Sequence, residues 1–193
     1  MSDQPKRPVI EHDGSVKGIL IATPAYGQYM TAHTGGVLYS IAQMLTAGGI
    51  ANQFLWFSMA DVVEARNVFL TLWYDHHPQF SHLLMVDNDM HFSPFLIREM
   101  IKFGKPLTGV FYSRREVPAD GNIAQIMIGH TLPGEQELED GFLKCRRVGA
   151  GILLISRDIV TRILKAHPEI NDLAEVGKLA QTGITRVIRA FDK

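Results

Sequence analysis

The sequence has a single cysteine, Cys145, among its 193 residues. One thiol forms no intramolecular disulfide and cannot build a thiolate-rich metal site. Long hydrophobic runs are also missing: apolar stretches such as 83–86 and 152–155 are far too short to span a bilayer. The polar first residues do not have the pattern of a secretory signal. We therefore expect a cytoplasmic protein with no membrane span.

Excess charge of either sign is absent as well. The chain has 19 Lys and Arg against 20 Asp and Glu, a formal net charge of -1. This balance predicts no bulk attraction to nucleic acid or anionic lipid, although a local basic patch is compatible with it. The sequence also lacks a Gly-x-x-x-x-Gly-Lys loop, a Gly-x-Gly-x-x-Gly turn after the first strand and a Gly-x-Ser-x-Gly elbow. ATPase, dinucleotide oxidoreductase and serine hydrolase functions lose their main support.

What is present is an alternation of strands and helices. Short apolar runs predict strands at 18–23, 53–57, 81–87, 107–112 and 149–155. Apolar periodicity and capping residues predict helices at 31–47, 62–73 and 95–103, and one that Ser156 begins and Pro168 ends. Because the strands are apolar on both faces, helices are expected to cover both faces of the sheet. The predicted fold class is α/β, a single Rossmann-like domain over 1–193 with a mostly parallel central sheet.

Two segments depart from this pattern. Residues 1–17 are polar, with two prolines and a glycine, and are predicted to be a loose N-terminal lead-in. Residues 113–147 contain charges, prolines and glycines, and predict an irregular surface excursion with a short strand at 123–128.

Three loops that follow predicted strands carry the candidate functional residues. Ligands of open α/β sheets bind at the carboxyl ends of the strands, where such loops converge. The first loop contains Tyr26, which either stacks on a base or is a half-buried loop aromatic. The third contains Arg114 and Arg115, which either hold phosphate or are solvated charges at the start of a loop.

The second loop contains the pair Asp87 and Asp89, directly after the most strand-like run in the chain. Two carboxylates delivered to the rim of a sheet repel each other unless a cation or hydrogen-bond donors compensate them. Oxygen ligands with few nearby imidazoles favour Mn²⁺ or Mg²⁺ over Zn²⁺. The alternative is that both are turn or cap residues before Ser93-Pro94. Arg66, in the preceding helix, is either a fixed cation for a phosphate, a partner for an acid at the sheet edge, or a surface arginine.

Four motifs together resemble the GT-A-type glycosyltransferases, which use nucleotide-sugar donors. The motifs are Thr23-Pro24-Ala25-Tyr26, Glu64-Ala65-Arg66-Asn67, Val86-Asp87-Asn88-Asp89-Met90 and Gly149-Ala150-Gly151 before an apolar strand that ends in Ser156-Arg157. They occur in this order across 18–163, most of the chain.

The resemblance implies a role for each motif. The nucleotide-sugar site would comprise Thr23, Pro24, Ala25, Tyr26, Arg66, Asp87, Asn88, Gly149 and Gly151. Asp87 would contact the ribose or a metal-bound water, and Asp89 would ligate Mn²⁺ or Mg²⁺, so that both belong to the metal site. The two glycines would allow the donor sugar or the acceptor to approach the backbone. The implied partners are a UDP- or GDP-linked sugar and a carbohydrate or glycan acceptor.

The resemblance also implies a late acidic segment with a catalytic base. After Ile170 only Asp172 and Glu175 are candidates, and only by default, so no catalytic residue is assigned. The base comes from the 116–140 loop, or the reaction needs none, or the chain is truncated. The predicted function is metal-dependent glycosyl transfer. The alternatives are a non-catalytic nucleotide- or glycan-binding module and, less favoured, a sugar-phosphate nucleotidyltransferase, because the loop after the first strand has no lysine or arginine.

Overall fold

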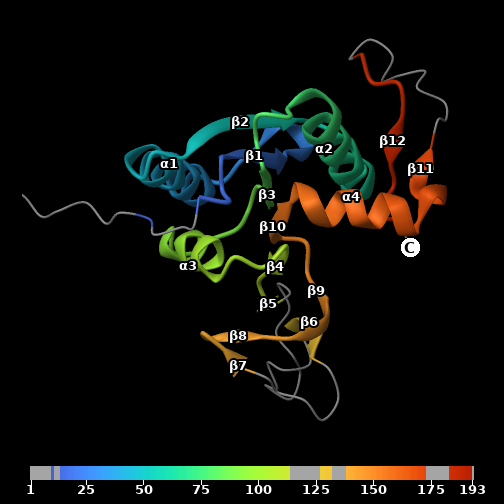
Figure 1. Ribbon diagram of the computed structural model, residues 1–193. Helices are drawn as coiled ribbons and strands as arrows, with labels where there is room; N and C mark the ends of the chain where they lie inside the picture. Colours follow the sequence, from blue (N-terminus) through green and yellow to red (C-terminus); the bar gives the residue numbers. More distant parts are fainter. Residues whose placement is uncertain (1–9, 11–13, 114–126, 132–137, 173–182, 193) are drawn as a thin grey trace, which may run out of the picture.

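The fold is built around a five-stranded mixed sheet. The computed structural model describes residues 10, 14–113, 127–131, 138–172 and 183–192. The strand order is β2 (Ala51–Phe57), β1 (Gly18–Pro24), β3 (His82–Val86), β10 (Ile152–Ser156) and β4 (Leu107–Gly109). Strand β1 pairs in parallel with β2 and β3, whereas β10 is antiparallel to both β3 and β4 (Figure 1).

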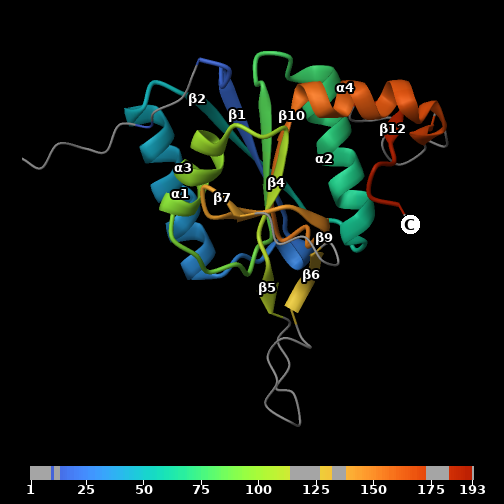
Figure 2. The ribbon, with the colours of Figure 1, turned by 60° about the horizontal axis from the view of Figure 1, so that its bottom comes forward.

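Helices cover both faces of this sheet, as the sequence predicts. Figure 2 shows α1 (Ala32–Ala47) and α3 (Phe95–Phe103) on one side, and α2 (Val62–His76) and α4 (Arg157–Ala166) on the other. The side chains of β1 alternate accordingly. Ile19 and Ile21 pack in the core on the α1 and α3 side, and Leu20 and Ala22 in the core on the α2 and α4 side.

Local sequence signals set the ends of these helices. The side chain of Asp61 accepts hydrogen bonds from the backbone N–H groups of the first turn of α2. Thr31 and Ser156 cap α1 and α4 in the same way. Helix α3 ends at Gly104, whose φ of 66° is the left-handed conformation that glycine adopts at little cost. The predicted helices are confirmed to within a few residues.

The direction of β10 differs from a parallel arrangement. Parallel neighbours need a long crossover, usually a helix, between them. In the residues described between β4 and β10, the chain instead forms a small sheet of β5 (Tyr112–Ser113), β6 (Met127–Thr131) and β9 (Cys145–Val148). The hairpin of β7 (Leu138–Glu139) and β8 (Phe142–Leu143) lies beside it (Figure 1).

The predicted irregular excursion over 113–147 therefore contains regular pairing. Of the strand predicted at 123–128, residues 123–126 lie outside the described residues, and β6 begins at Met127. The strand predicted at 107–112 is two strands, β4 and β5, separated at Val110 and Phe111.

The ends of the described chain also pack on the core. Ile10 and Val16 are buried, so the predicted loose lead-in is wrong for these two residues. After α4 come the 3-10 turn η3 (Pro168–Ile170) and the strand pair β11 (Asn171–Asp172) and β12 (Val187–Ile188). Within the part of the chain described here, no helix is both long and apolar enough to cross a membrane.

Candidate functional site

The acids predicted to form the site lie together in one cavity. Asp87, Asn88 and Asp89 follow the carboxyl end of β3 and line a cavity of about 210 Å³. Pro24 and Tyr26 border it from the end of β1, together with the segment that leads into α2. Tyr26 belongs to the 3-10 turn η1 (Tyr26–Gln28) and is 70% exposed, which leaves its ring open to a stacking partner. The structure thus brings together residues from two of the predicted loops.

Arg66 forms an ion pair with Asp87. Its Nη2 donates to Asp87 Oδ1 at 2.8 Å and to Oδ2 at 2.9 Å, and the side chains are only 12% and 22% exposed. The backbone N–H of Asp87 also donates to the carbonyl of Gly151 at 2.9 Å. Of the roles predicted for Arg66, partner of an acid at the sheet edge is confirmed. Contact with a nucleotide stays a prediction.

Burial raises the pKa of Asp87 above its ordinary value, and the nearby Asp89 carboxylate raises it further. The charge and hydrogen bond of Arg66 act in the opposite direction. The carboxyl group is therefore held as an ion mainly by Arg66, in surroundings that otherwise favour its protonated form.

The raised pKa of Asp87 predicts a pH dependence of stability. Between the ordinary pKa of 3.8 and the raised value, the folded protein retains a proton that the unfolded chain releases. The free energy of unfolding therefore falls as the pH rises through this window. Urea unfolding of the natural chain and of Asp87→Asn from pH 3.5 to 8 measures it. The stability of the natural chain relative to the variant should decrease with rising pH, and a constant or increasing difference would contradict the assignment.

Other predicted site residues are placed differently. Thr23 and Ala25 are buried and do not line the cavity, and Gly149 is also buried. At Gly151 a Cβ atom would lie 2.8 Å from the ring of Tyr112. The close approach that the sequence analysis expected from a sugar or acceptor is made here by an aromatic side chain of the chain itself. Gly151 is needed for this internal packing.

Tyr112 is a site residue that the sequence analysis did not select. Its hydroxyl accepts a hydrogen bond from the backbone N–H of Gly151 at 3.2 Å. Burial raises its pKa, and the carboxylates of Asp87 and Asp89 add to the rise. The hydroxyl therefore stays protonated at neutral pH and has its own proton to donate. The one available signal was its place at the end of the fourth predicted strand.

Asn88 ties the acidic loop to the loop before α1. Its side-chain Nδ2 donates to the backbone carbonyl of Tyr29 at 2.7 Å, and its backbone carbonyl accepts from the N–H of Thr31 at 3.0 Å. In this structure Asn88 therefore fixes the spacing of the two loops that border the cavity.

Two buried polar atoms at predicted site residues have no hydrogen-bond partner in the described part of the chain. They are Thr23 Oγ1 and Arg66 Nε. Because a buried unpaired polar atom costs free energy, such atoms are rare and call for a reason, of which a functional site is one.

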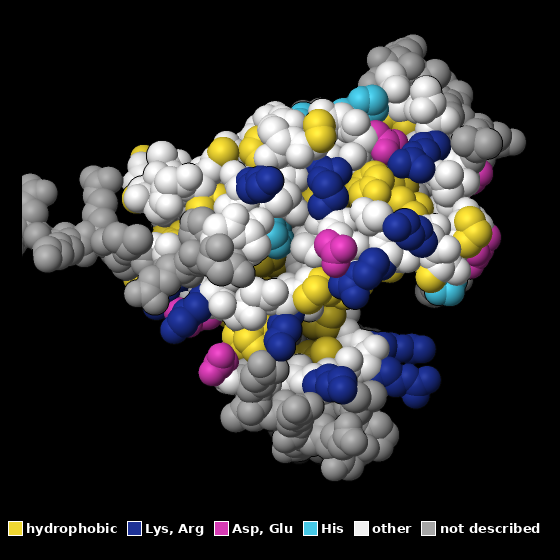
Figure 3. Space-filling model, in the orientation of Figure 1, with side chains coloured by type: hydrophobic (Ala, Val, Ile, Leu, Met, Phe, Trp, Pro, Cys, Tyr) yellow, Lys and Arg dark blue, Asp and Glu magenta, His cyan; other side chains and the backbone are white. Residues whose placement is uncertain are grey.

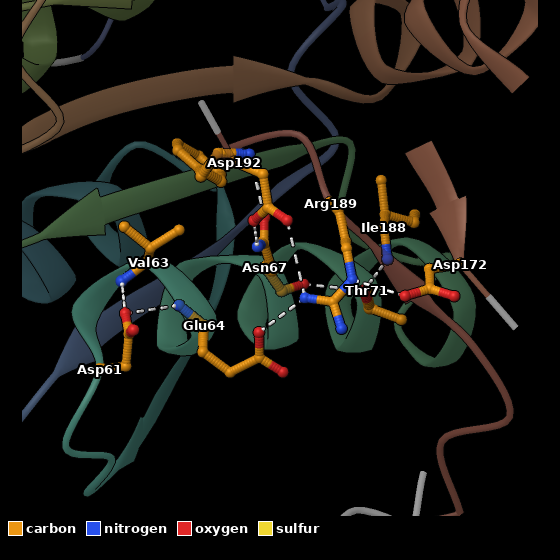
Figure 4. Close-up of polar contacts among 10 residues, drawn as sticks. Asp61, Val63, Glu64, Asn67, Thr71, Asp172, Ile188, Arg189 and Asp192 are labelled. Carbon is orange, nitrogen blue, oxygen red and sulfur yellow. Dashed lines mark hydrogen bonds and ion pairs between the residues drawn. The ribbon is translucent and has the colours of Figure 1, made fainter. Parts of the chain in front are cut away.

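The end of the chain fastens helix α2, which carries Arg66. Figure 4 shows Arg189 between acidic side chains: its Nε donates to Asp172 at 2.6 Å and its Nη1 to Glu64 at 3.0 Å. Buried Asn67 donates to Asp192 at 2.6 Å and accepts the N–H of Phe191 at 3.0 Å. These contacts fix the helix against the C-terminal segment.

The contacts of Arg189 also involve one of the two default candidates for a catalytic base. Asp172, a default candidate, is paired with Arg189. The other default candidate, Glu175, lies outside the described residues, as do Arg114, Arg115 and most of the 116–140 loop.

A divalent cation fits this site only with help from its ligand. In the ranges that the structure describes, no three His, Cys, Asp or Glu side chains form a metal-binding group. Asp87 already neutralises Arg66, whereas Asp89 is exposed at the cavity. Mg²⁺ is often bound by one or two carboxylates plus substrate phosphates. The donor set fits a cation shared with a diphosphate and does not fit one held by the protein alone.

Comparisons with known proteins show no family to which this chain belongs. No protein-family model matches the chain, and no curated protein matches it. Among solved structures the chain is similar to the crystal structure of A197 from STIV. The identity is 14%, over 76% of this chain and 68% of that chain, with a TM-score of 0.45. A likeness of this strength carries no argument about function.

Proposed function

We propose that the protein is a metal-dependent glycosyltransferase of GT-A-like architecture that takes a sugar from a nucleoside-diphosphate donor. The observation that carries the proposal is the shared cavity of Asp87 and Asp89 after β3, with Tyr26 at its border. The ion pair with Arg66 supports it, because a pair held from a neighbouring helix keeps one carboxylate fixed in the cavity.

Each residue then has a stated task. Asp89 would ligate the cation, Asp87 would contact the ribose or a metal-bound water, and the exposed ring of Tyr26 would stack on the base. A bound Mn²⁺ or Mg²⁺ would supply positive charge to offset that of the departing nucleoside diphosphate. The Asp87 carboxylate stays in place because Arg66 donates to both of its oxygens.

The proposal predicts that nucleotide and metal bind together. Calorimetry should show weak binding of Mn²⁺ alone, weak binding of UDP or GDP alone, and binding at least tenfold tighter when nucleotide and Mn²⁺ are both present. Asp89→Asn should abolish the gain from Mn²⁺, because an amide is a much poorer ligand than a carboxylate.

Asp158→Asn is the matched control, since Asp158 is an exposed aspartate of α4, paired with Arg162. It should bind as the natural chain does. If neither UDP nor GDP gains affinity from Mn²⁺, or if the two variants behave alike, the proposal is wrong.

A non-catalytic nucleotide- or glycan-binding module is the second candidate. The pairing of Asp172 with Arg189 favours it, because it occupies a carboxylate that was a candidate base. Incubation with nucleotide sugars and Mn²⁺ separates the two. Donor hydrolysis or transfer that is lost in Asp89→Asn supports the enzyme, and metal-dependent binding without turnover supports the module.

A further inference from the structure

A second and larger cavity lies beside β10 and β4, separate from the candidate donor cavity at the ends of β1 and β3. It is a groove of about 800 Å³, bordered by β4, β8, β9, α4 and the last described residues of the chain. In Figure 3 it opens between the main body and the smaller sheet, with hydrophobic side chains at its base and Lys and Arg side chains beside it. Its volume lies in the range of small-molecule binding sites, about 300–1,000 Å³.

The walls of the groove expose large apolar side chains. Leu107 on β4 is 48% exposed and Leu143 on β8 is 38% exposed. Ile159 and Ile163 face the groove from α4, four residues apart and hence on one side of the helix. A concavity lined mainly by apolar side chains is typical of small-molecule binding sites.

Among the described residues that line the groove, every charged side chain is cationic. They are Lys105, Lys144, Arg146 and Arg147, and the described lining includes no Asp or Glu. Since the whole chain has a formal net charge of -1, this concentration of positive charge is local. An apolar groove with a basic edge complements a ligand with an apolar chain and an anionic head.

We propose that this groove binds one molecule of an anionic amphiphile, an alkyl or prenyl chain that carries a phosphate. The apolar walls bind the alkyl or prenyl chain. The basic residues of β9, with Lys144 directly before it, bind the phosphate. The shape favours a single chain over a membrane surface, because the apolar residues line a concavity rather than project from a face. The binding itself does not depend on the proposed function.

The position of the groove adds a consequence that does rest on the proposed function. Ala150 lines the groove, and the next residue, Gly151, accepts the backbone N–H of Asp87. The groove and the candidate donor cavity are therefore neighbours across one short loop. In a glycosyltransferase this arrangement makes the amphiphile the acceptor, in place of the carbohydrate that the sequence resemblance implies.

Cys145 provides a direct readout of occupancy. It is the single cysteine of the chain, it lines the groove, and it is half-buried. The rate at which a thiol reagent modifies Cys145 is measured with and without octyl or decyl phosphate, each kept below its critical micelle concentration. Both should slow the modification. Two added methylenes should lower the half-protecting concentration roughly fifteenfold, if each buried methylene contributes about 0.8 kcal/mol.

Charge variants and other probes complete the test. Arg146→Gln/Arg147→Gln should weaken protection by the alkyl phosphates tenfold or more, with each rate normalised to the same variant without ligand. Arg162→Gln/Lys165→Gln removes the same charge from the exposed side of α4 and should have no effect. Alkyl glucosides and inorganic phosphate, which each lack one half of the ligand, should protect weakly.

Three outcomes would overturn the proposal: no protection by either alkyl phosphate, protection that does not depend on chain length, or protection unaffected by Arg146→Gln/Arg147→Gln. Binding to anionic phospholipid vesicles without protection by monomeric alkyl phosphates would point to a membrane surface instead. The protection assay contains no nucleotide or metal. A negative result in it therefore contradicts the groove proposal and leaves the proposed glycosyltransferase function to its own test.

Discussion

Replacing Arg66 with methionine is expected to lower the free energy of unfolding by about 3 kcal/mol at neutral pH. The change leaves the carboxylate of Asp87 largely buried without the guanidinium that donates to both of its oxygens. Because burial already raises the pKa of Asp87, the variant carboxyl should take up a proton at higher pH than in the natural chain. The loss of stability should therefore shrink as the pH falls. Urea unfolding at pH 7 and pH 5 measures both effects.

Two controls separate the ion pair from general damage. Arg66→Met/Asp87→Asn should recover much of the loss, because removing both charges leaves no buried ion alone. Arg98→Met removes a more exposed arginine, paired with Glu99, and should cost less than about 1 kcal/mol. If Arg66→Met costs no more than Arg98→Met, the pair does not hold Asp87 in place. The double variant should also lose Mn²⁺-dependent nucleotide binding while it remains folded.

Replacing Arg157 with methionine is expected to cost about 3 kcal/mol as well. The guanidinium donates to the carbonyls of Trp73, Tyr74, His77 and Phe80 at 2.7–3.1 Å. These oxygens belong to the end of α2 and the loop into β3, where the last carbonyl oxygens of a helix lack N–H donors within the helix itself. The guanidinium also lies over the ring of Trp73 at 4.5 Å. The variant should therefore loosen the connection between the helix of Arg66 and the strand before Asp87.

Arg157→Lys and Arg162→Met test this explanation. Lysine keeps the charge but not the planar fork of donors, so it should restore only part of the lost stability. Arg162 is on the same helix, exposed and paired with Asp158, so its removal should cost less than about 1 kcal/mol. Thermal unfolding of the three variants gives the comparison. Equal losses for Arg157→Met and Arg162→Met would refute the role given to Arg157.

Local sequence signals predicted most of the elements because their causes are local. Asp61 and Ser156 cap their helices with their own side chains, and Gly104 ends α3 through its own backbone freedom. The apolar strands were recognisable from composition alone. Their direction was not, since a strand buried on both faces has the same pattern whichever way it runs. The available hint that β10 is antiparallel was that the sequence predicts no helix between the strands at 107–112 and 149–155.

The candidate site was predicted in part for the same reason. Asp87 and Asp89 could be placed at a sheet edge because they directly follow a strand. Tyr112 could not be linked to Gly151, nor Arg189 to Glu64, because these residues are 39 and 125 positions apart. Sequence spacing carries no information about which distant side chains meet. The groove lies among several such segments and was likewise invisible in the sequence.

The sequence by itself determined the helices, the strands of the central sheet and the delivery of two acids to the end of β3. Each of these follows from side-chain periodicity, capping chemistry or backbone freedom within a few residues. Tertiary structure alone decided that Arg66 pairs with Asp87, that Tyr112 fills the space over Gly151 and that Arg157 closes the end of α2. It also decided that cations from separate segments border one apolar groove. These features depend on the packing of elements distant in the chain, which only the folded chain specifies.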